Sequence, residues 1–185
     1  FHATDVTDAD AADSVGVVSD GAVGVDILSD GVVSVGVVIV AAGSGSRLGA
    51  DRPKAFVELT GRTLLEHSLD GVLASGATSV VVVVPESALE QAHQIVDLAG
   101  GCDCATVTVV TGGAERTDSV RAGLAALDPA VDVVLVHDAA RCLTPVQVFE
   151  RVISAVAGGA AGAVPGIPVV DTVKTVDARG VITAT

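Results

Sequence analysis

From Val35 onward, apolar runs alternate with stretches of mixed polarity. Four valine-rich runs, at 35–43, 79–85, 106–110 and 131–138, predict strands. The continuous apolar runs at 35–43 and 79–85 are typical of strands buried in a parallel sheet that is covered on both faces. The intervening patterns predict helices over 63–74, from Pro85 toward Leu98, up to Leu127, and over 145–157. Each predicted strand is therefore followed by a predicted helix.

This alternation predicts right-handed βαβ units and an α/β fold. We expect a Rossmann-like, three-layer arrangement with a mostly parallel central sheet. Ligands of such sheets bind beyond the carboxyl ends of the strands. The loops after the first, third and fourth strands read AAGSGSRLG, TGGAERTDS and HDAAR, and they are the most polar and glycine-rich part of this region. We expect the functional site there.

Composition narrows the classes of protein. The chain has 185 residues, which suits one domain, and its three Phe residues imply a core of small side chains. The net charge is −13, and the first 46 residues contain seven Asp and no Lys or Arg. This balance argues against nucleic-acid binding, and no apolar run is long enough to span a membrane. No positively charged segment opens the chain, so we expect a cytoplasmic protein.

Residues 1–34 differ from the remainder. They are acidic and repetitive, with two S-D-G turn signals between short valine runs. Such turns can join hairpin strands, but base-free acidic sequence at a terminus favours a flexible or poorly packed extension. We expect a domain over 35–185 preceded by this extension.

No metal site is predicted from the protein's own side chains. Cys102 and Cys104 form a C-x-C, Cys142 stands alone, and the histidines show no ligand spacing.

The first loop carries the strongest chemical signal. Its glycines at 43, 45 and 49 miss the dinucleotide fingerprint by one residue, and the loop lacks the G-K-[ST] ending of a Walker A motif. Arg47 lies between the second and third of these glycines, and Lys54 follows the third by five residues. Backbone N–H groups with two cations favour phosphate, so we predict a phosphate-binding loop rather than a plain turn.

Four motifs occur in one order: A-A-G-S-G-S-R-L-G with R-P-K-A-F, then G-G-A-E-R-T-D-S-V, L-V-H-D-A-A-R and D-T-V-K. Together they resemble the 2-C-methyl-D-erythritol 4-phosphate cytidylyltransferase family, within the sugar-phosphate nucleotidyltransferases. The resemblance runs from about Val35 to the last residue. It implies transfer of CMP from CTP to 2-C-methyl-D-erythritol 4-phosphate with release of pyrophosphate, a step of isoprenoid precursor synthesis. The attack on the α-phosphorus is in line and needs positioning and charge stabilisation.

The resemblance also implies roles for individual residues. Arg47 and Lys54 would stabilise the transition state, and Arg141 and Thr172 would contact the alcohol phosphate, Thr172 in a partner's site. Asp138 would lie near the ribose and that substrate. The nucleotide would contact Ala41, Ala42, Gly43, Gly45, Ser46, Gly113, Ser119, Asp138 and Ala139. Mg²⁺ would be held mainly by CTP phosphates and water.

Several of these residues have simpler interpretations. Asp138 could cap a following helix, Ser119 could be a capping hydroxyl, and Arg141 could be a surface cation. Arg116 and Asp118 favour a local ion pair at a helix start. His137 favours a structural histidine with satisfied hydrogen bonds.

The C-terminal part allows three functional hypotheses. In the family, D-T-V-K starts a β-arm that joins a homodimer. We expect an arm beginning near residue 168 and, because the arm is incomplete here, a weakened homodimer. The later motifs of the family are absent, so the chain reads as C-terminally incomplete. The first hypothesis is the family's own cytidylyl transfer. The others are a cytidylyltransferase for another alcohol phosphate, such as ribitol 5-phosphate, and an inactive nucleotide-binding fragment.

Overall fold

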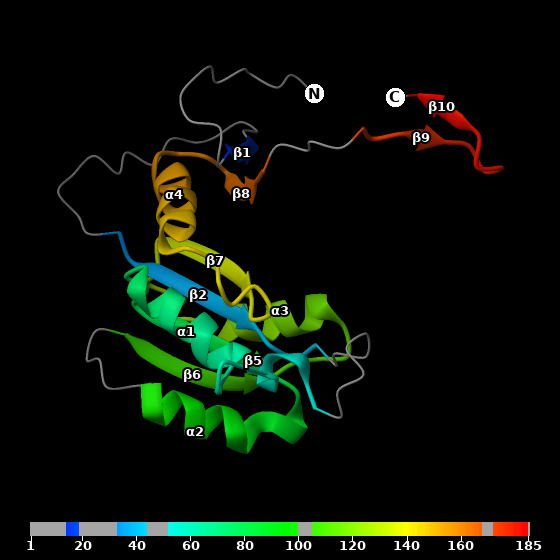
Figure 1. Ribbon diagram of the computed structural model, residues 1–185. Coiled ribbons are helices and arrows are strands. Elements are labelled where there is room, and N and C mark those ends of the chain that lie inside the picture. Colours follow the sequence, from blue (N-terminus) through cyan, green and yellow to red (C-terminus); the bar gives the residue numbers. More distant parts are fainter. Residues whose placement is uncertain (1–13, 19–32, 44–51, 100–104, 168–171, 185) are drawn as a thin grey trace.

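Four parallel strands form the centre of the molecule in the computed structural model (Figure 1). They are β2 (Val35–Val40), β5 (Ser79–Val84), β6 (Thr106–Thr111) and β7 (Val133–Asp138). Their order is β6-β5-β2-β7, with Val38 of β2 opposite Val81 on one side and Val136 on the other. The structure describes residues 14–18, 33–43, 52–99, 105–167 and 172–184. The predicted strands and their parallel pairing are confirmed.

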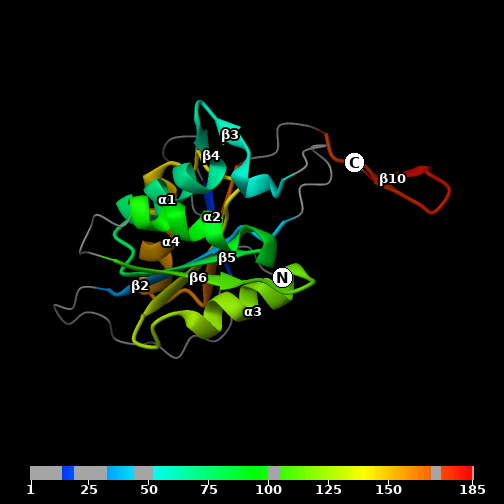
Figure 2. The ribbon, with the colours of Figure 1, turned by 90° about the horizontal axis from the view of Figure 1, so that it is seen from below.

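Helices cover both faces of this sheet, which confirms the three-layer arrangement. One face packs against α1 (Leu64–Ala74), α2 (Leu89–Ala99) and α4 (Val146–Ala157), and the other against α3 (Arg116–Ala126). Figure 2 shows α3 on the opposite side of the sheet from α1 and α2. None of the described helices is long and apolar enough to cross a lipid bilayer.

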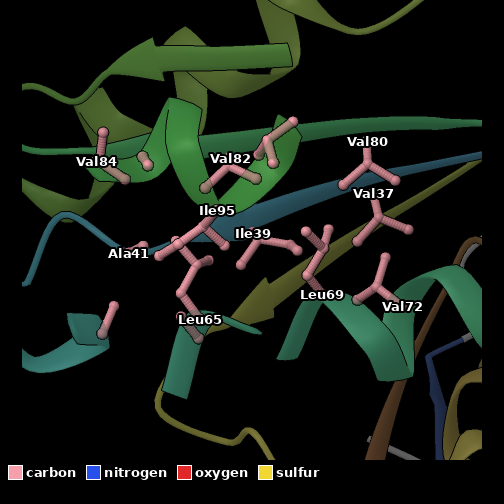
Figure 3. Close-up of a cluster of buried hydrophobic side chains, with 14 of the residues drawn as sticks. Val37, Ile39, Ala41, Leu65, Leu69, Val72, Val80, Val82, Val84 and Ile95 are labelled. Carbon is pink, nitrogen blue, oxygen red and sulfur yellow. The ribbon is translucent and has the colours of Figure 1, made fainter. Parts of the chain in front are cut away.

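The larger core lies between the sheet and the three helices of the first face. Alternate residues of β2 and β5 meet Leu65, Leu69 and Val72 of α1 there, as Figure 3 shows. These side chains are fully buried. The start of α1 is set by a capping box in which the Thr63 Oγ1 accepts from the Glu66 N–H at 3.2 Å. The Thr63 N–H donates to Glu66 Oε2 at 2.6 Å in return.

The second face is built on small residues. Val38, Val81, Val83 and Leu127 form its core cluster. Gly123 of α3 lies against Val38 and Val83 so closely that an added Cβ would overlap both side chains. Glycine therefore lets the helix backbone approach the sheet.

Burial differs between the strands. Every residue of β5 is buried, whereas β7 alternates, with Val133, Leu135 and His137 buried and Val134 and Val136 exposed. The expectation of two fully buried faces is thus wrong for β7. The reason is that α3 packs against β2, β5 and β6 and leaves this face of β7 uncovered.

Shorter elements complete the fold. The 3-10 helices are η2 (Lys54–Phe56) and η3 (Glu86–Ala88), and β3 (Glu58–Leu59) pairs with β4 (Arg62–Thr63). An antiparallel hairpin of β9 (Thr175–Val176) and β10 (Ile182–Ala184) projects away from the sheet in both views. This hairpin lies in the part of the chain where we expected a β-arm, and residues 168–171, where we expected the arm to begin, lie outside the described residues.

Described residues of the expected N-terminal extension contact the body through β1 (Ser14–Val18) and through residues 33–34. β1 pairs antiparallel with β8 (Gly162–Gly166), whose backbone groups need partners. Val33 packs against the core, and the Ser34 N–H donates to Asp132 Oδ2 at 2.9 Å. Val33 and Ser34 therefore pack with the body.

Candidate active site

A pocket of about 780 Å³ lies beyond the carboxyl ends of β2 and β7. The loops after β2, β6 and β7 line it, together with Lys54 of η2. These are the loops in which we expected the site. Among the predicted site residues, nine line the pocket: Ala41, Ala42, Gly43, Lys54, Gly113, Ser119, Asp138, Ala139 and Arg141. The fold thus gathers residues that lie up to 100 positions apart.

Four predicted residues do not enter this description of the pocket. Gly45, Ser46 and Arg47 lie outside the described residues. Thr172 is described and exposed before the hairpin, and it is not among the residues that line the pocket.

Backbone hydrogen bonds hold two walls of the pocket, the loops after β2 and β7, against the end of the sheet. The Ala41 N–H donates to the Val83 carbonyl at 2.8 Å, and the Ala139 N–H donates to the Val40 carbonyl at 3.1 Å. The ladder therefore continues one residue past each strand end. The Lys54 N–H donates to the Gly43 carbonyl at 3.4 Å, which closes the glycine-rich loop and brings Lys54 to the pocket.

The third wall depends on close packing at the start of α3. A Cβ added at Gly112 would lie 2.6 Å from Ser119 Oγ and 2.8 Å from the Ala42 Cβ, and one at Gly113 would overlap Asp118. Glycine is therefore required at both positions, where the loop after β6 packs against the loop after β2 and the start of α3. Ser119 is 2 % exposed, and its Oγ donates to the Glu115 carbonyl at 3.3 Å. Its hydroxyl stays at the pocket with lone pairs available as acceptors.

Asp138 is the centre of the charged groups. Its Oδ1 accepts from Arg116 Nη2 at 2.9 Å, and its Oδ2 lies 3.6 Å from Arg141 Nε. The predicted pair of Arg116 with Asp118 is wrong, because Asp118 instead pairs with Arg121 at 3.1 Å and Arg116 reaches across the pocket. The capping interpretation of Asp138 is also wrong, because β7 runs into turns and α4 begins only at Val146.

Arg116 is the functional candidate that sequence reasoning missed. The available signal was its place at the start of a helix that follows a strand and a glycine pair. The first residues of such a helix lie at the carboxyl end of the sheet, where the ligand binds. With Lys54 and Arg141 it makes three cations against the carboxylates of Glu115 and Asp138 among the described lining residues. This excess of positive charge favours an anionic ligand such as a phosphate ester.

His137 lies beneath the site and faces the core. The residue is 8 % exposed, and its ring meets the Phe149 ring edge-on, with centroids 5.0 Å apart. Burial lowers the pKa of His137, and this effect outweighs the opposing charge of Asp138. The structural role fits, but the expected satisfied hydrogen bonding does not, because Nε2 has no partner among the described residues.

A metal would find few protein ligands here. Within the described ranges, no group of three or more His, Cys, Asp or Glu side chains is placed to hold an ion. Asp138 is the half-exposed carboxylate beside the cations of the pocket, with 37 % of its side chain accessible. It could supply one oxygen to a cation that is otherwise bound by ligand phosphates and water.

Comparison with known proteins agrees with this geometry. Residues 35–185 match the family model described as IspD: 2-C-methyl-D-erythritol 4-phosphate cytidylyltransferase. The chain is 56% identical over 147 residues to the bifunctional enzyme IspD/IspF of Clavibacter michiganensis subsp. michiganensis, covering 79% of this chain and 36% of that protein. It is 51% identical over 149 residues to the 2-C-methyl-D-erythritol 4-phosphate cytidylyltransferase of Rhodococcus jostii. That match covers 80% of this chain and 62% of the relative.

A solved structure has the same fold. The 4-diphosphocytidyl-2C-methyl-D-erythritol synthase of Anaerococcus prevotii matches with a TM-score of 0.66 and 25% identity, over 83% of this chain and 64% of that one. The chain spans less than two thirds of the length of each of these relatives.

Proposed function

Because the chain belongs to the 2-C-methyl-D-erythritol 4-phosphate cytidylyltransferase family, we propose that it transfers CMP from CTP to 2-C-methyl-D-erythritol 4-phosphate. The observation that carries this proposal is the pocket at the carboxyl ends of β2 and β7. Lys54, Arg116 and Arg141 enter it from three different segments. A triphosphate is the kind of anion that such a site can hold.

The proposed chemistry is an in-line displacement. A phosphate oxygen of the alcohol phosphate attacks the α-phosphorus of CTP, the bond to the bridging oxygen breaks, and pyrophosphate leaves with the electron pair. Lys54 stabilises the charge on the phosphate oxygens, with Arg47 as its proposed companion. Arg141 orients the attacking phosphate. The residues at 41–43 and Gly113 approach the nucleotide with their backbone, and no covalent enzyme intermediate is required.

A divalent cation, proposed to be Mg²⁺, would neutralise part of the charge on the CTP phosphates when bound. The residues present fit such an ion only as a partner of the nucleotide, since among the described lining residues Asp138 is the carboxylate that lies between Arg116 and Arg141. The protein's own contribution is to hold the CTP phosphates and the alcohol phosphate in line for the attack on the α-phosphorus.

We also propose a cytoplasmic homodimer that is joined through the β9–β10 hairpin. Val176, Val181 and Ile182 are exposed on this hairpin, and their apolar surface would be buried by a second copy. In a dimer, Thr172 at the base of the hairpin would reach the partner's site. Sedimentation analysis of the chain, with and without residues 172–185, tests this part of the proposal.

Substitution of Lys54 tests the function directly. Lys54→Ala should weaken CTP–Mg²⁺ binding or turnover by roughly 3–4 kcal/mol, a factor of several hundred, because a cation is removed from a phosphate site. Arg52→Ala is the matched control, since Arg52 is exposed two residues earlier and does not line the pocket. Calorimetric titration of CTP and pyrophosphate release measure the two quantities. Equal CTP affinity and equal turnover in Lys54→Ala and the parent would refute the assignment of this residue.

The same assay separates the alternative substrates. Pyrophosphate release with 2-C-methyl-D-erythritol 4-phosphate, and none with ribitol 5-phosphate, supports the proposal. The reverse preference identifies another cytidylyltransferase. CTP binding without turnover of either identifies a nucleotide-binding protein.

A further inference from the structure

Two polar side-chain atoms are buried beneath the pocket without a hydrogen-bond partner among the described residues. They are Ser68 Oγ of α1 and His137 Nε2 of β7. Ser68 is 2 % exposed and His137 8 %, so bulk water does not solvate either side chain. An unpaired polar group in a protein core is costly, and nearly all such groups in native proteins have a partner. These two atoms therefore call for one.

Ser68 and His137 lie at the same height along the strands. In the register of β2 and β7, His137 is opposite Ile39. Figure 3 shows Ile39 between Leu65 and Leu69 of α1. Ser68 belongs to this same turn of the helix, so it lies level with Ile39 and therefore with His137.

Ser68 also lies on the side of α1 that faces β7 and α4. Gly71 follows it by three residues and therefore shares this side of the helix. A Cβ added at Gly71 would lie 3.9 Å from Cε2 of Phe149, a residue of α4. The same Phe149 ring meets the His137 ring, with centroids 5.0 Å apart. The two unpartnered atoms thus belong to one region of the core, where α1, β7 and α4 meet.

A single water molecule can satisfy both atoms. The Ser68 hydroxyl both donates and accepts, and each nitrogen of a neutral imidazole does one or the other. Burial lowers the pKa of His137, which keeps its ring neutral. Water serves either tautomer, because it can donate to Nε2 or accept from it. Buried waters typically make two to four hydrogen bonds, and the Thr144 carbonyl, 3.7 Å from the added Cβ of Gly71, offers a further acceptor nearby.

The end of β7 is the element that such a link would fasten. Among the described strands, β7 pairs only with β2, so a single ladder holds it. Its last residue, Asp138, and the following Ala139 and Arg141 line the pocket. An anchor on His137 acts one residue before this wall begins.

We propose that Ser68 and His137 bind one buried water molecule, and that this link makes Ser68 a positioning residue for the pocket wall that starts at Asp138. The proposal does not depend on the identity of the ligand, and it stands or falls separately from the proposed function.

Native-state amide hydrogen exchange, measured by NMR, tests the positioning role. The Ala139 N–H donates to the Val40 carbonyl at the end of the β7 ladder. Its exchange should accelerate about five- to tenfold in Ser68→Ala, the scale of one net hydrogen bond, while the amides of β5 keep the parent's rates. Ser75→Ala is the matched control, since Ser75 lies two turns further along α1 and its Oγ donates to the Val72 carbonyl at 2.7 Å. It should leave Ala139 unchanged. Uniform acceleration across the sheet in Ser68→Ala, or none at Ala139, overturns the positioning role.

A double-mutant cycle and a crystal structure test the water link itself. In a His137→Leu background, Ser68→Ala should not accelerate the Ala139 exchange further, because the link is already broken. An additive effect overturns the link. Ser68→Cys, which keeps the volume but hydrogen-bonds weakly, allows the same comparison if Ser68→Ala does not fold. The crystal structure should show one water within hydrogen-bond distance of both Ser68 Oγ and His137 Nε2. A direct bond between the two side chains, or another protein group paired with either atom, refutes the proposal.

Discussion

Gly123→Ala should destabilise the protein, although alanine is the better helix former. Gly123 lies within α3 at the point where the helix meets the sheet. A Cβ at this position would lie 2.9 Å from Val83 Cγ2 and still closer to Val38 Cγ1. Both valines are fully buried and β-branched, so neither can turn its side chain away at low cost.

The magnitude follows from the distance that must be recovered. Carbon atoms pack best at about 3.5–4.0 Å, so α3 has to move away from the sheet by roughly 1 Å. Overpacking costs about 1–3 kcal/mol, and the very close approach to the buried Val38 Cγ1 calls for the upper part of this range, about 2–3 kcal/mol. Alanine returns about 1 kcal/mol of helix propensity. The net loss of about 1–2 kcal/mol corresponds to a melting temperature lower by about 2–8 °C in a chain of this size. Displacement of α3 should also weaken CTP binding, because Ser119 and Arg116 move with the helix.

Gly71→Ala in α1 is the matched control. The nearest atoms to an added Cβ there are the Thr144 carbonyl oxygen at 3.7 Å and Phe149 Cε2 at 3.9 Å, which are ordinary contacts. This variant should therefore gain about 0.5–1 kcal/mol from helix propensity. Thermal and urea denaturation of both variants measure the two effects. The packing argument is refuted if Gly123→Ala is as stable as the parent, or if the two substitutions shift stability in the same direction.

Three further outcomes are expected. Thr63→Ala should lower the free energy of unfolding by about 1 kcal/mol in urea denaturation, because the capping box of α1 is lost; no change would contradict a role for the cap. Burial lowers the pKa of His137 in the folded protein below its ordinary 6.5, so the unfolded chain binds the proton more readily. The free energy of unfolding should therefore fall as the pH drops below 6.5 toward the pKa of the folded state. His137→Gln should flatten this slope, and His93→Gln, at an exposed position, should not; equal slopes in all three proteins would rule out His137 as the source. Deletion of residues 1–32, which spares the packing of Val33, should lower the melting temperature by less than about 4 °C, since an isolated two-stranded pairing is marginal; a drop above about 10 °C would place the extension in the core.

Much of the fold could be predicted because its signals are local. The valine runs of β2 and β5 are long and continuous, and each is followed by a helix with a clear apolar side. The boundaries of α1 and α4 agree with prediction to within one residue, since Thr63 and Pro145 mark their starts chemically. The exposure of one face of β7 could not be predicted in this way. A valine reads as apolar whether or not a helix covers it.

The candidate site was predicted as a set of loops but not as a set of contacts. The rule that ligands bind at the carboxyl ends of parallel strands was enough to select the loops after β2, β6 and β7. It did not tell which arginine meets which carboxylate. Sequence proximity favoured Arg116 with Asp118, whereas the helix direction turns Arg116 toward Asp138 and leaves Asp118 for Arg121.

The sequence by itself determined the alternation of strand and helix, the parallel sheet and the three loops that carry glycine and charge, because hydrophobic period and backbone propensity act over a few residues. The tertiary structure alone decided the contacts between distant segments. It brought Arg116 to Asp138, buried His137 against Phe149, and set β1 beside β8. These three contacts join elements that are far apart along the chain, and their separation in sequence does not predict their distance in space.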